Sequence, residues 1–142
     1  MLDEQRKNRP MSLSIGQIGE QTGLSADTLR YYERIGLLPN VARNDGGQRR
    51  YSEKDLGRLK FIRRAQAMDF SLQEISDLLH LREATGDVRA EVRGMTEQKL
   101  QAIQVRIAEL TQLRDELSGL ISACQASEGC CPIIEHMAGE SE

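Results

Sequence analysis

Three cysteines lie within eight positions near the C-terminal end of this 142-residue chain: Cys124, Cys130 and Cys131. The rest of the sequence contains no other cysteine. Thiolates are the ligands that soft metal ions prefer, and two thiolates at the ends of a short loop can hold one such ion. The segment SACQASEGCCPIIEHM therefore predicts a metal-binding loop, because small buried hydrophobic cysteines are not expected at the end of a polar chain.

The number of thiolates decides which ion such a loop would hold. Two thiolates in linear geometry suit Cu(I), Ag(I) or Au(I), three suit Hg(II), Pb(II) or an As(III)-like centre, and four nitrogen or sulfur ligands suit Zn(II). Cys130 is a candidate third ligand, and His136 lies five residues beyond Cys131. These residues alone leave the alternatives open.

Two other functions would use the same thiols without a metal. In one, Cys124 and Cys131 form a disulfide when the protein is oxidised, which makes the chain a redox sensor. In the other, the chain is a thiol reductase. The enzyme is disfavoured, because the sequence has no Cys-x-x-Cys motif in a strand–helix–strand context and no nearby catalytic base.

The composition indicates a small cytoplasmic protein without a membrane span. Hydrophobic residues make up 39% of the sequence, and no apolar run approaches the roughly 20 residues that a span requires. The first twelve residues, MLDEQRKNRPMS, have no apolar segment of the kind found in secretory signals. They are polar and aperiodic, and we expect residues 1–12 to be a disordered extension.

Charge is divided unevenly between the two halves of the sequence. Residues 1–70 hold 13 Lys and Arg against 9 Asp and Glu, whereas residues 71–142 hold 6 against 13. A basic half joined to an acidic half is typical of a nucleic-acid-binding part attached to a part with another role.

The pattern of the basic half predicts a helix-turn-helix followed by a small β hairpin. A short amphipathic helix within residues 13–23 ends at Gly23, and Ser25 is placed to cap a second helix over residues 26–35. Asp45, Gly46 and Gly47 then form a strong turn signal between two strand-like segments, which is typical of a wing. Ser52 and Ser71 are predicted caps of two further helices, over residues 53–68 and 72–83.

One long helix is predicted over residues 88–121. Its apolar residues recur at spacings of three and four, close to a heptad repeat: Leu100, Ile103, Ile107, Leu110, Leu113, Leu117 and Leu120. The rest of the chain is too small to cover this stripe. We therefore expect a homodimer through a coiled coil; the alternative is that the helix folds back on its own domain.

Basic and aromatic residues on the second helix and the wing could contact DNA. Helix N-termini enter the major groove, where Arg binds guanine with two hydrogen bonds, and wing arginines and tyrosine hydroxyls suit phosphate oxygens. One of the two adjacent tyrosines of the helix is expected to pack inward instead. The predicted DNA-binding residues are Thr28, Arg30, Tyr31, Arg43, Arg49 and Tyr51.

Three segments carry a resemblance to a known family: IGQIGEQTGLSADTLRYYERIGLL, RNDGGQRRYSEKDL and FIRRAQAMDFSLQEISDLL. Together they resemble the MerR family of transcription regulators, over about residues 13 to 134. The resemblance implies a mainly helical fold, with a winged helix-turn-helix DNA-binding domain and small β wing at residues 13–86. It also implies a long antiparallel coiled-coil dimerisation helix at 87–123 and a C-terminal metal-binding loop and tail at 124–142.

The resemblance also implies a mechanism and site residues. Family dimers bind promoters with an over-long spacer, and effector binding makes them bend and untwist that DNA so that RNA polymerase can use it. Arg30, Tyr31, Arg43, Arg49 and Tyr51 match DNA-contacting positions of the family. Gln48 departs from the pattern, because many relatives have Tyr there. Residues 1–12 extend beyond the usual start, and Met11 is an alternative one.

The thiol segment is similar to the loop of the metal-sensing branch, in which two cysteines flank a short loop and the second precedes Pro-Ile. Cys124 and Cys131 match these two, the loop is one residue shorter than in the copper-sensing type, and Cys130 is additional. Sensors of divalent ions in this branch carry another cysteine at the start of the dimerisation helix. Sensors of monovalent ions carry serine there. The corresponding position here is Arg89, which is neither cysteine nor serine. Because the additional thiol is missing, the resemblance favours Cu(I) or Ag(I), with Hg(II) as the alternative.

Overall fold

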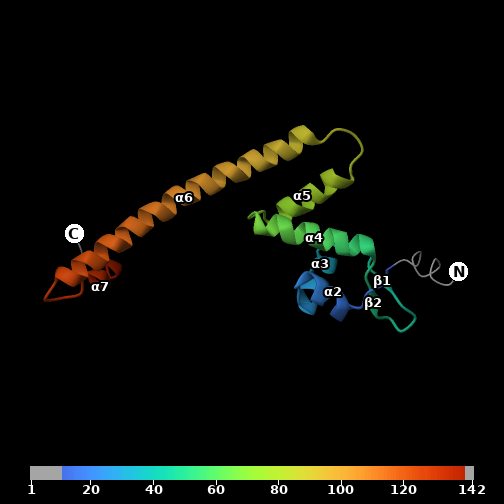
Figure 1. The fold of residues 1–142 in the computed structure, drawn as a ribbon, viewed down its shortest axis with the longest axis horizontal. Helices are drawn as coiled ribbons and strands as arrows, with labels where there is room; N and C mark the ends of the chain where they lie inside the picture. Colours follow the sequence, from blue (N-terminus) through green and yellow to red (C-terminus); the bar gives the residue numbers. More distant parts are fainter. Residues whose placement is uncertain (1–10, 140–142) are drawn as a thin grey trace. The chain divides into compact units, whose positions relative to one another are not determined.

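The computed structural model describes residues 11–139, which divide into two compact units, one ending at Val88 and the other beginning at Arg89. The first unit contains α2 to α5 and a two-stranded hairpin, and the second contains α6 and α7 (Figure 1). The prediction of disorder for residues 1–10 lies outside the described residues.

Two short helices joined by a tight turn open the first unit. Helix α2 spans Ile15–Thr22, and α3 spans Ala26–Arg34. Ser14 accepts a hydrogen bond from the Gln17 N–H at 3.2 Å, and the Gln17 side chain accepts one from the Ser14 N–H at 2.9 Å, which forms a capping box. Gly23 ends α2 at φ 73°, a left-handed conformation that a glycine adopts without steric cost. The predicted helix-turn-helix is therefore present.

Gly19 allows the turn after α2 to pass close to the helix backbone. A Cβ atom at this position would lie 2.9 Å from the Leu24 carbonyl oxygen, which is too close for an unstrained contact. We expect Gly19→Ala to lower the free energy of unfolding by roughly 1–2 kcal/mol, because overpacking outweighs the gain in helix propensity. Gly16→Ala is the matched control, since its Cβ would meet only Ser14 Oγ at 3.9 Å. Urea denaturation of both variants measures the difference, and equal midpoints would contradict the prediction.

The wing is an antiparallel hairpin of β1, Ala42–Arg43, and β2, Arg49–Arg50, with Arg43 paired to Arg49. A further bridge joins Leu13 to Tyr51 and brings the chain before α2 alongside the hairpin. Here residues 11 and 12 depart from the prediction of disorder. Met11 packs against the core, and Ser12 accepts two hydrogen bonds from Arg50, at 2.9 and 2.8 Å.

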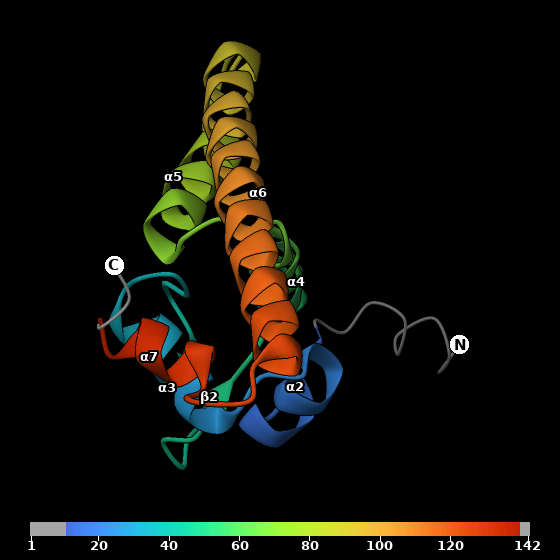
Figure 2. The same ribbon diagram turned by 90° about the vertical axis from the view of Figure 1, so that its left-hand side faces the viewer.

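Helices α4, Glu53–Ala67, and α5, Leu72–Glu83, complete the first unit. Ser52 and Ser71 both form the predicted caps, each within a capping box. These helices pack with α2 and α3 around one core (Figure 2). Its most deeply buried side chains are Ile18, Leu29, Leu38, Tyr51, Leu59, Ile62, Ile75 and Leu79.

The second unit consists of α6, Arg89–Ala126, and the short α7, Pro132–Met137, which folds back beside the end of α6 (Figure 1). No residue of α6 is buried, and its apolar stripe is exposed: Leu100, Ile107, Leu110, Leu113 and Leu117 are 43–58% exposed. The helix continues beyond the predicted end at residue 123, so Cys124 lies in its last turn. Among the described residues, no helix is long and apolar enough to cross a membrane.

Candidate metal centre and DNA-binding face

Two of the three cysteines lie together where α7 turns back on α6. Cys124 belongs to the last turn of α6, and Cys131 precedes α7 as its N-cap residue. Both are partly buried, both are free thiols, and the Cys124 thiol forms a side-chain hydrogen bond with Cys131. The structure therefore brings together the two ends of the predicted metal-binding loop.

The surroundings of this pair favour ionisation of Cys131. The backbone N–H groups of Ile134 and Ile133 face its sulfur and lower the pKa of Cys131, although neither contact has the geometry of a full capping hydrogen bond. The pKa of Cys124 is raised, because its thiol proton is held in the hydrogen bond to Cys131. Of the two thiols, Cys131 therefore loses its proton at the lower pH.

This asymmetry predicts an order of reaction with an alkylating reagent. A pKa below the ordinary value means that the Cys131 thiolate is present at lower pH, whereas the raised pKa of Cys124 delays its ionisation. In a Cys130→Ser background, we expect iodoacetamide to modify Cys131 first across the pH range from 6 to 9. Fragment mass spectrometry of the modified chain identifies the site. Equal labelling, or labelling of Cys124 first, would contradict this assignment.

Cys130 stands apart from the pair. It is exposed, and its carbonyl oxygen accepts a hydrogen bond from Ser127 Oγ at 3.2 Å. Over the part of the chain that the structure describes, no three His, Cys, Asp or Glu side chains gather into a cluster that could hold a metal ion. The structure thus places Cys124 beside Cys131, and Cys130 lies outside this pair.

His136, the other potential ligand of this segment, contacts a carboxylate instead. Its Nε2 atom lies 2.6 Å from Oε1 of Glu116 on α6. Both side chains are about half exposed, at 43% and 46%. Sequence reasoning did not find Glu116, because it lies twenty residues away and forms the contact only when α7 folds back.

Three of the predicted DNA-binding residues lie on α3. Thr28 is near its N-terminus, where its hydroxyl is 2.9 Å from Ser25 Oγ. Arg30 pairs with Asp27 at 3.1 Å and remains half exposed. Tyr31 is 40% exposed with Arg34 over its ring, whereas Tyr32 is buried. The inward-packing tyrosine is therefore Tyr32, and Arg30 and Tyr31 are accessible to a ligand.

The two predicted wing arginines are joined to α3 by a single carboxylate. Arg49 Nε donates to Glu33 at 2.6 Å, and Arg43 lies 3.6 Å from the other oxygen of Glu33. The hydrogen bond to Glu33 raises the pKa of Arg49. Glu33 was not identified from the sequence. The signal that could have indicated it is an acidic residue among basic ones, which often forms ion pairs with its neighbours. Arg49 thus fixes the wing against α3 in this structure.

Tyr51 does not lie on the surface as the DNA-contact prediction required. Its side chain is fully buried in the core, and its hydroxyl has no hydrogen-bond partner among the described residues. Burial raises the pKa of Tyr51. Because the hydroxyl is buried, it is not accessible to a phosphate in this structure.

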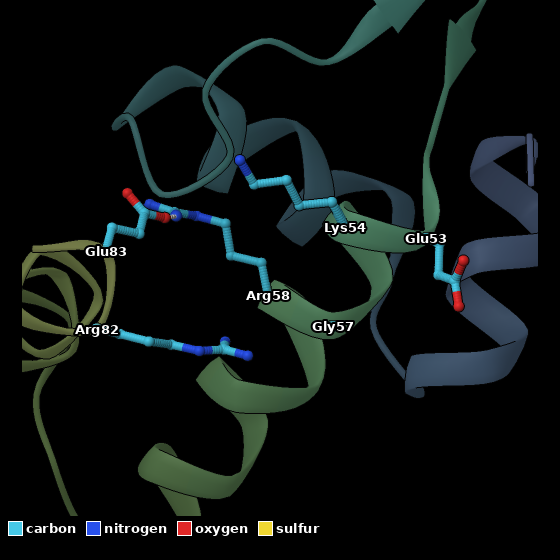
Figure 3. A pocket seen from close by; sticks show the side chains of 6 residues that line it. All are labelled: Glu53, Lys54, Gly57, Arg58, Arg82 and Glu83. Atoms are coloured by element: carbon cyan, nitrogen blue, oxygen red, sulfur yellow. Dashed lines mark hydrogen bonds and ion pairs between the residues drawn. The ribbon is translucent and has the colours of Figure 1, made fainter. Parts of the chain in front are cut away.

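A cavity of about 620 Å³ lies between α4 and α5, lined mainly by charged residues (Figure 3). Arg58 forms an ion pair with Glu83 and also donates to the Leu37 carbonyl. Arg82 instead lies over the Phe61 ring. In Figure 3, Glu53 points away from the other charged side chains. Arg58 therefore ties α5 to α4, and the charges of the cavity do not converge on one point.

The helix-turn-helix with its wing and the exposed α3 face define a DNA-binding regulator of the winged-helix class. Residues 13–81 match the model of MerR helix-turn-helix regulatory proteins, and residues 56–120 match the MerR DNA-binding model. The mercuric resistance operon regulatory protein of Serratia marcescens is 38% identical over 133 residues, which cover 92% of this chain and 91% of that protein. The chain belongs to the MerR family.

Two solved structures extend the comparison. The regulator PbrR691 from Ralstonia metallidurans CH34, in complex with lead(II), is 34% identical with a TM-score of 0.74, and the match covers 88% of this chain and 98% of that one. HiNmlR, a MerR family regulator bound to promoter DNA, is 31% identical with a TM-score of 0.58, and the match covers 82% and 85%. The mercuric resistance regulator and the lead(II) complex support the metal-sensing branch, but they do not single out a copper type.

Proposed function

We propose that this protein is a metal-responsive transcription regulator that acts as a homodimer on promoter DNA in the cytoplasm. Each chain holds one soft monovalent ion, Cu(I), Ag(I) or Au(I), between Cys124 and Cys131. The metal-loaded dimer distorts the promoter so that RNA polymerase can use it. Regulators of this class act through DNA shape, so the site and the DNA need not be adjacent.

The observation that carries the proposal is the pairing of Cys124 with Cys131. Two free, partly buried cysteines, one in the last turn of α6 and one before α7, supply two sulfur ligands at opposite ends of one loop. Two thiolates in linear geometry suit monovalent coinage metals, and their combined charge of −2 falls to −1 when one such ion binds. The exposed position of Cys130 supports two ligands rather than three.

A three-thiolate sensor of Hg(II) or Pb(II) is the second candidate. The names of two relatives, a mercuric resistance regulator and a lead(II) complex, favour it. It requires Cys130 to turn inward or a ligand from a second chain. A redox sensor of the same fold, with a disulfide between Cys124 and Cys131, is the third. Such a redox sensor would respond to an oxidant in the absence of metal, unlike the two metal sensors.

In vitro transcription separates these candidates. The reduced protein, its promoter and RNA polymerase are combined with Ag(I), Cu(I), Hg(II), Pb(II), Zn(II) or an oxidant. The proposal predicts activation by Ag(I) and Cu(I) at about one ion per chain. Activation by Hg(II) or Pb(II) alone would support the second candidate, and activation by the oxidant alone would support the third.

The DNA-binding part of the proposal predicts a specific defect in Arg30→Ala. Arg30 is the exposed arginine of the first turns of α3, and a guanine contact of this kind contributes roughly 1–3 kcal/mol of base discrimination. We expect about a tenfold to hundredfold loss of affinity for the promoter and little change for unrelated DNA. Fluorescence anisotropy at fixed salt measures both. Arg106→Ala, an exposed arginine of α6, is the control, and equal losses in the two variants would contradict the assignment.

A further inference from the structure

Closure of the thiol loop depends on how firmly α7 lies against α6. Cys124 and Cys131 are separated by six residues. They lie together because the chain reverses direction between them and α7 packs beside the end of α6 (Figure 1). Loosening α7 would therefore separate the two sulfurs without changing either of them.

The apolar contacts of α7 are limited, because Pro132 and Ile133 are only partly buried. No residue of this six-residue helix is buried. Its two largest exposed apolar side chains, Ile134 and Met137, are 68% and 71% exposed. Helices this short are not stable by themselves, so their position depends on side-chain contacts with a neighbour.

Glu116 and His136 supply such a contact at the far end of the α6–α7 hairpin. Glu116 lies eight residues before Cys124, about 12 Å along the helix axis at 1.5 Å per residue. His136 lies five residues after Cys131, in the last turn of α7. The 2.6 Å contact thus clamps the open end of the hairpin, while the two cysteines occupy the turn end.

We propose that Glu116 and His136 form a clasp that fixes α7 on α6 and so sets the separation of Cys124 and Cys131. They are positioning residues of the thiol pair and not ligands. The inference rests on the proposed function only where it concerns metal affinity, because the spacing of the two thiols can be measured without a metal.

The test uses the full-length reduced protein with Cys130→Ser, so that two thiols remain. In a glutathione redox buffer, the two thiols reduce one glutathione disulfide to two glutathiones and form the Cys124–Cys131 disulfide. The equilibrium gives the effective concentration of one thiol at the other. We expect His136→Ala and Glu116→Ala each to lower this effective concentration roughly twofold to fivefold, the contribution of one half-exposed side-chain contact.

Three further results belong to the same test. The double variant should be no worse than either single variant, because both remove the same contact. His136→Gln should keep most of the parent's effective concentration, since glutamine also offers an N–H to the carboxylate. His80→Ala on α5 and Glu109→Ala on α6 are matched controls that should equal the parent. Unchanged operator binding and circular dichroism would show that each variant is folded.

Two outcomes would overturn the clasp. In the first, His136→Ala and Glu116→Ala have the same effective thiol concentration as the parent protein. The other is a loss of Ag(I) affinity in His136→Ala of a hundredfold or more with an unchanged disulfide equilibrium, which would make His136 a ligand. A parent protein that binds no Ag(I) would refute the metal proposal and leave the disulfide measurement to decide on the clasp.

Discussion

Replacing either Cys124 or Cys131 with serine is expected to abolish metal-induced transcription while promoter binding persists. Each variant loses one of the two sulfur ligands, and a hydroxyl is a poor ligand for a soft ion. Removing a residue that only hydrogen-bonds to a metal ligand lowers metal affinity about 10-fold to 100-fold. Removing a ligand itself should therefore lower the affinity more than a hundredfold. Competition titrations with Ag(I) and transcription assays measure the two effects.

Cys130→Ser is the matched control for these variants. Cys130 is exposed and lies outside the thiol pair, so its replacement should leave the Ag(I) response within about twofold of the parent. A Cys130→Ser protein as inactive as the other two would indicate a three-thiolate site. Metal response in all three serine variants would refute the thiol site altogether.

Replacing Ile107 and Leu110 with aspartate is expected to convert the proposed dimer into monomers that bind the promoter poorly. Both side chains are more than half exposed in the single chain, as expected for residues that a second helix covers. Burying a side chain of this size contributes about 1.5–3 kcal/mol, and the dimer loses four of them. The dissociation constant should rise roughly a thousandfold or more. Sedimentation at micromolar concentration measures the association.

Ala108→Asp with Gln112→Asp provides the control for the dimer prediction. Both residues are exposed and lie on the face of α6 opposite the apolar stripe. This double variant adds the same charge to the same helix and should remain a dimer. A wild-type protein that sediments as a monomer at these concentrations would contradict the coiled-coil proposal.

The local features of the fold could be predicted because each depends on a short stretch of sequence. Ser25, Ser52 and Ser71 cap their helices as predicted, since a cap is formed within three residues. The turn between the wing strands follows from Asp45, Gly46 and Gly47. The loop ends Cys124 and Cys131 were identified from residue type and spacing alone.

The features that could not be predicted depend on contacts between distant residues. Glu33 meets Arg49 across sixteen positions, and His136 meets Glu116 across twenty. Tyr51 is buried in the core among side chains of helices that are distant in sequence, and no periodicity reveals this. Helix α7 has six residues, too few to show a helical repeat, although Pro132 after Cys131 is typical of a helix start.

X-ray absorption spectroscopy of the silver- or copper-loaded reduced protein counts the sulfur atoms that bind the ion. We expect one ion per chain with two sulfur neighbours, and the same spectrum for the Cys130→Ser protein. Three sulfur neighbours in the parent protein, or a spectrum that changes when Cys130 is replaced, would contradict a site formed by Cys124 and Cys131.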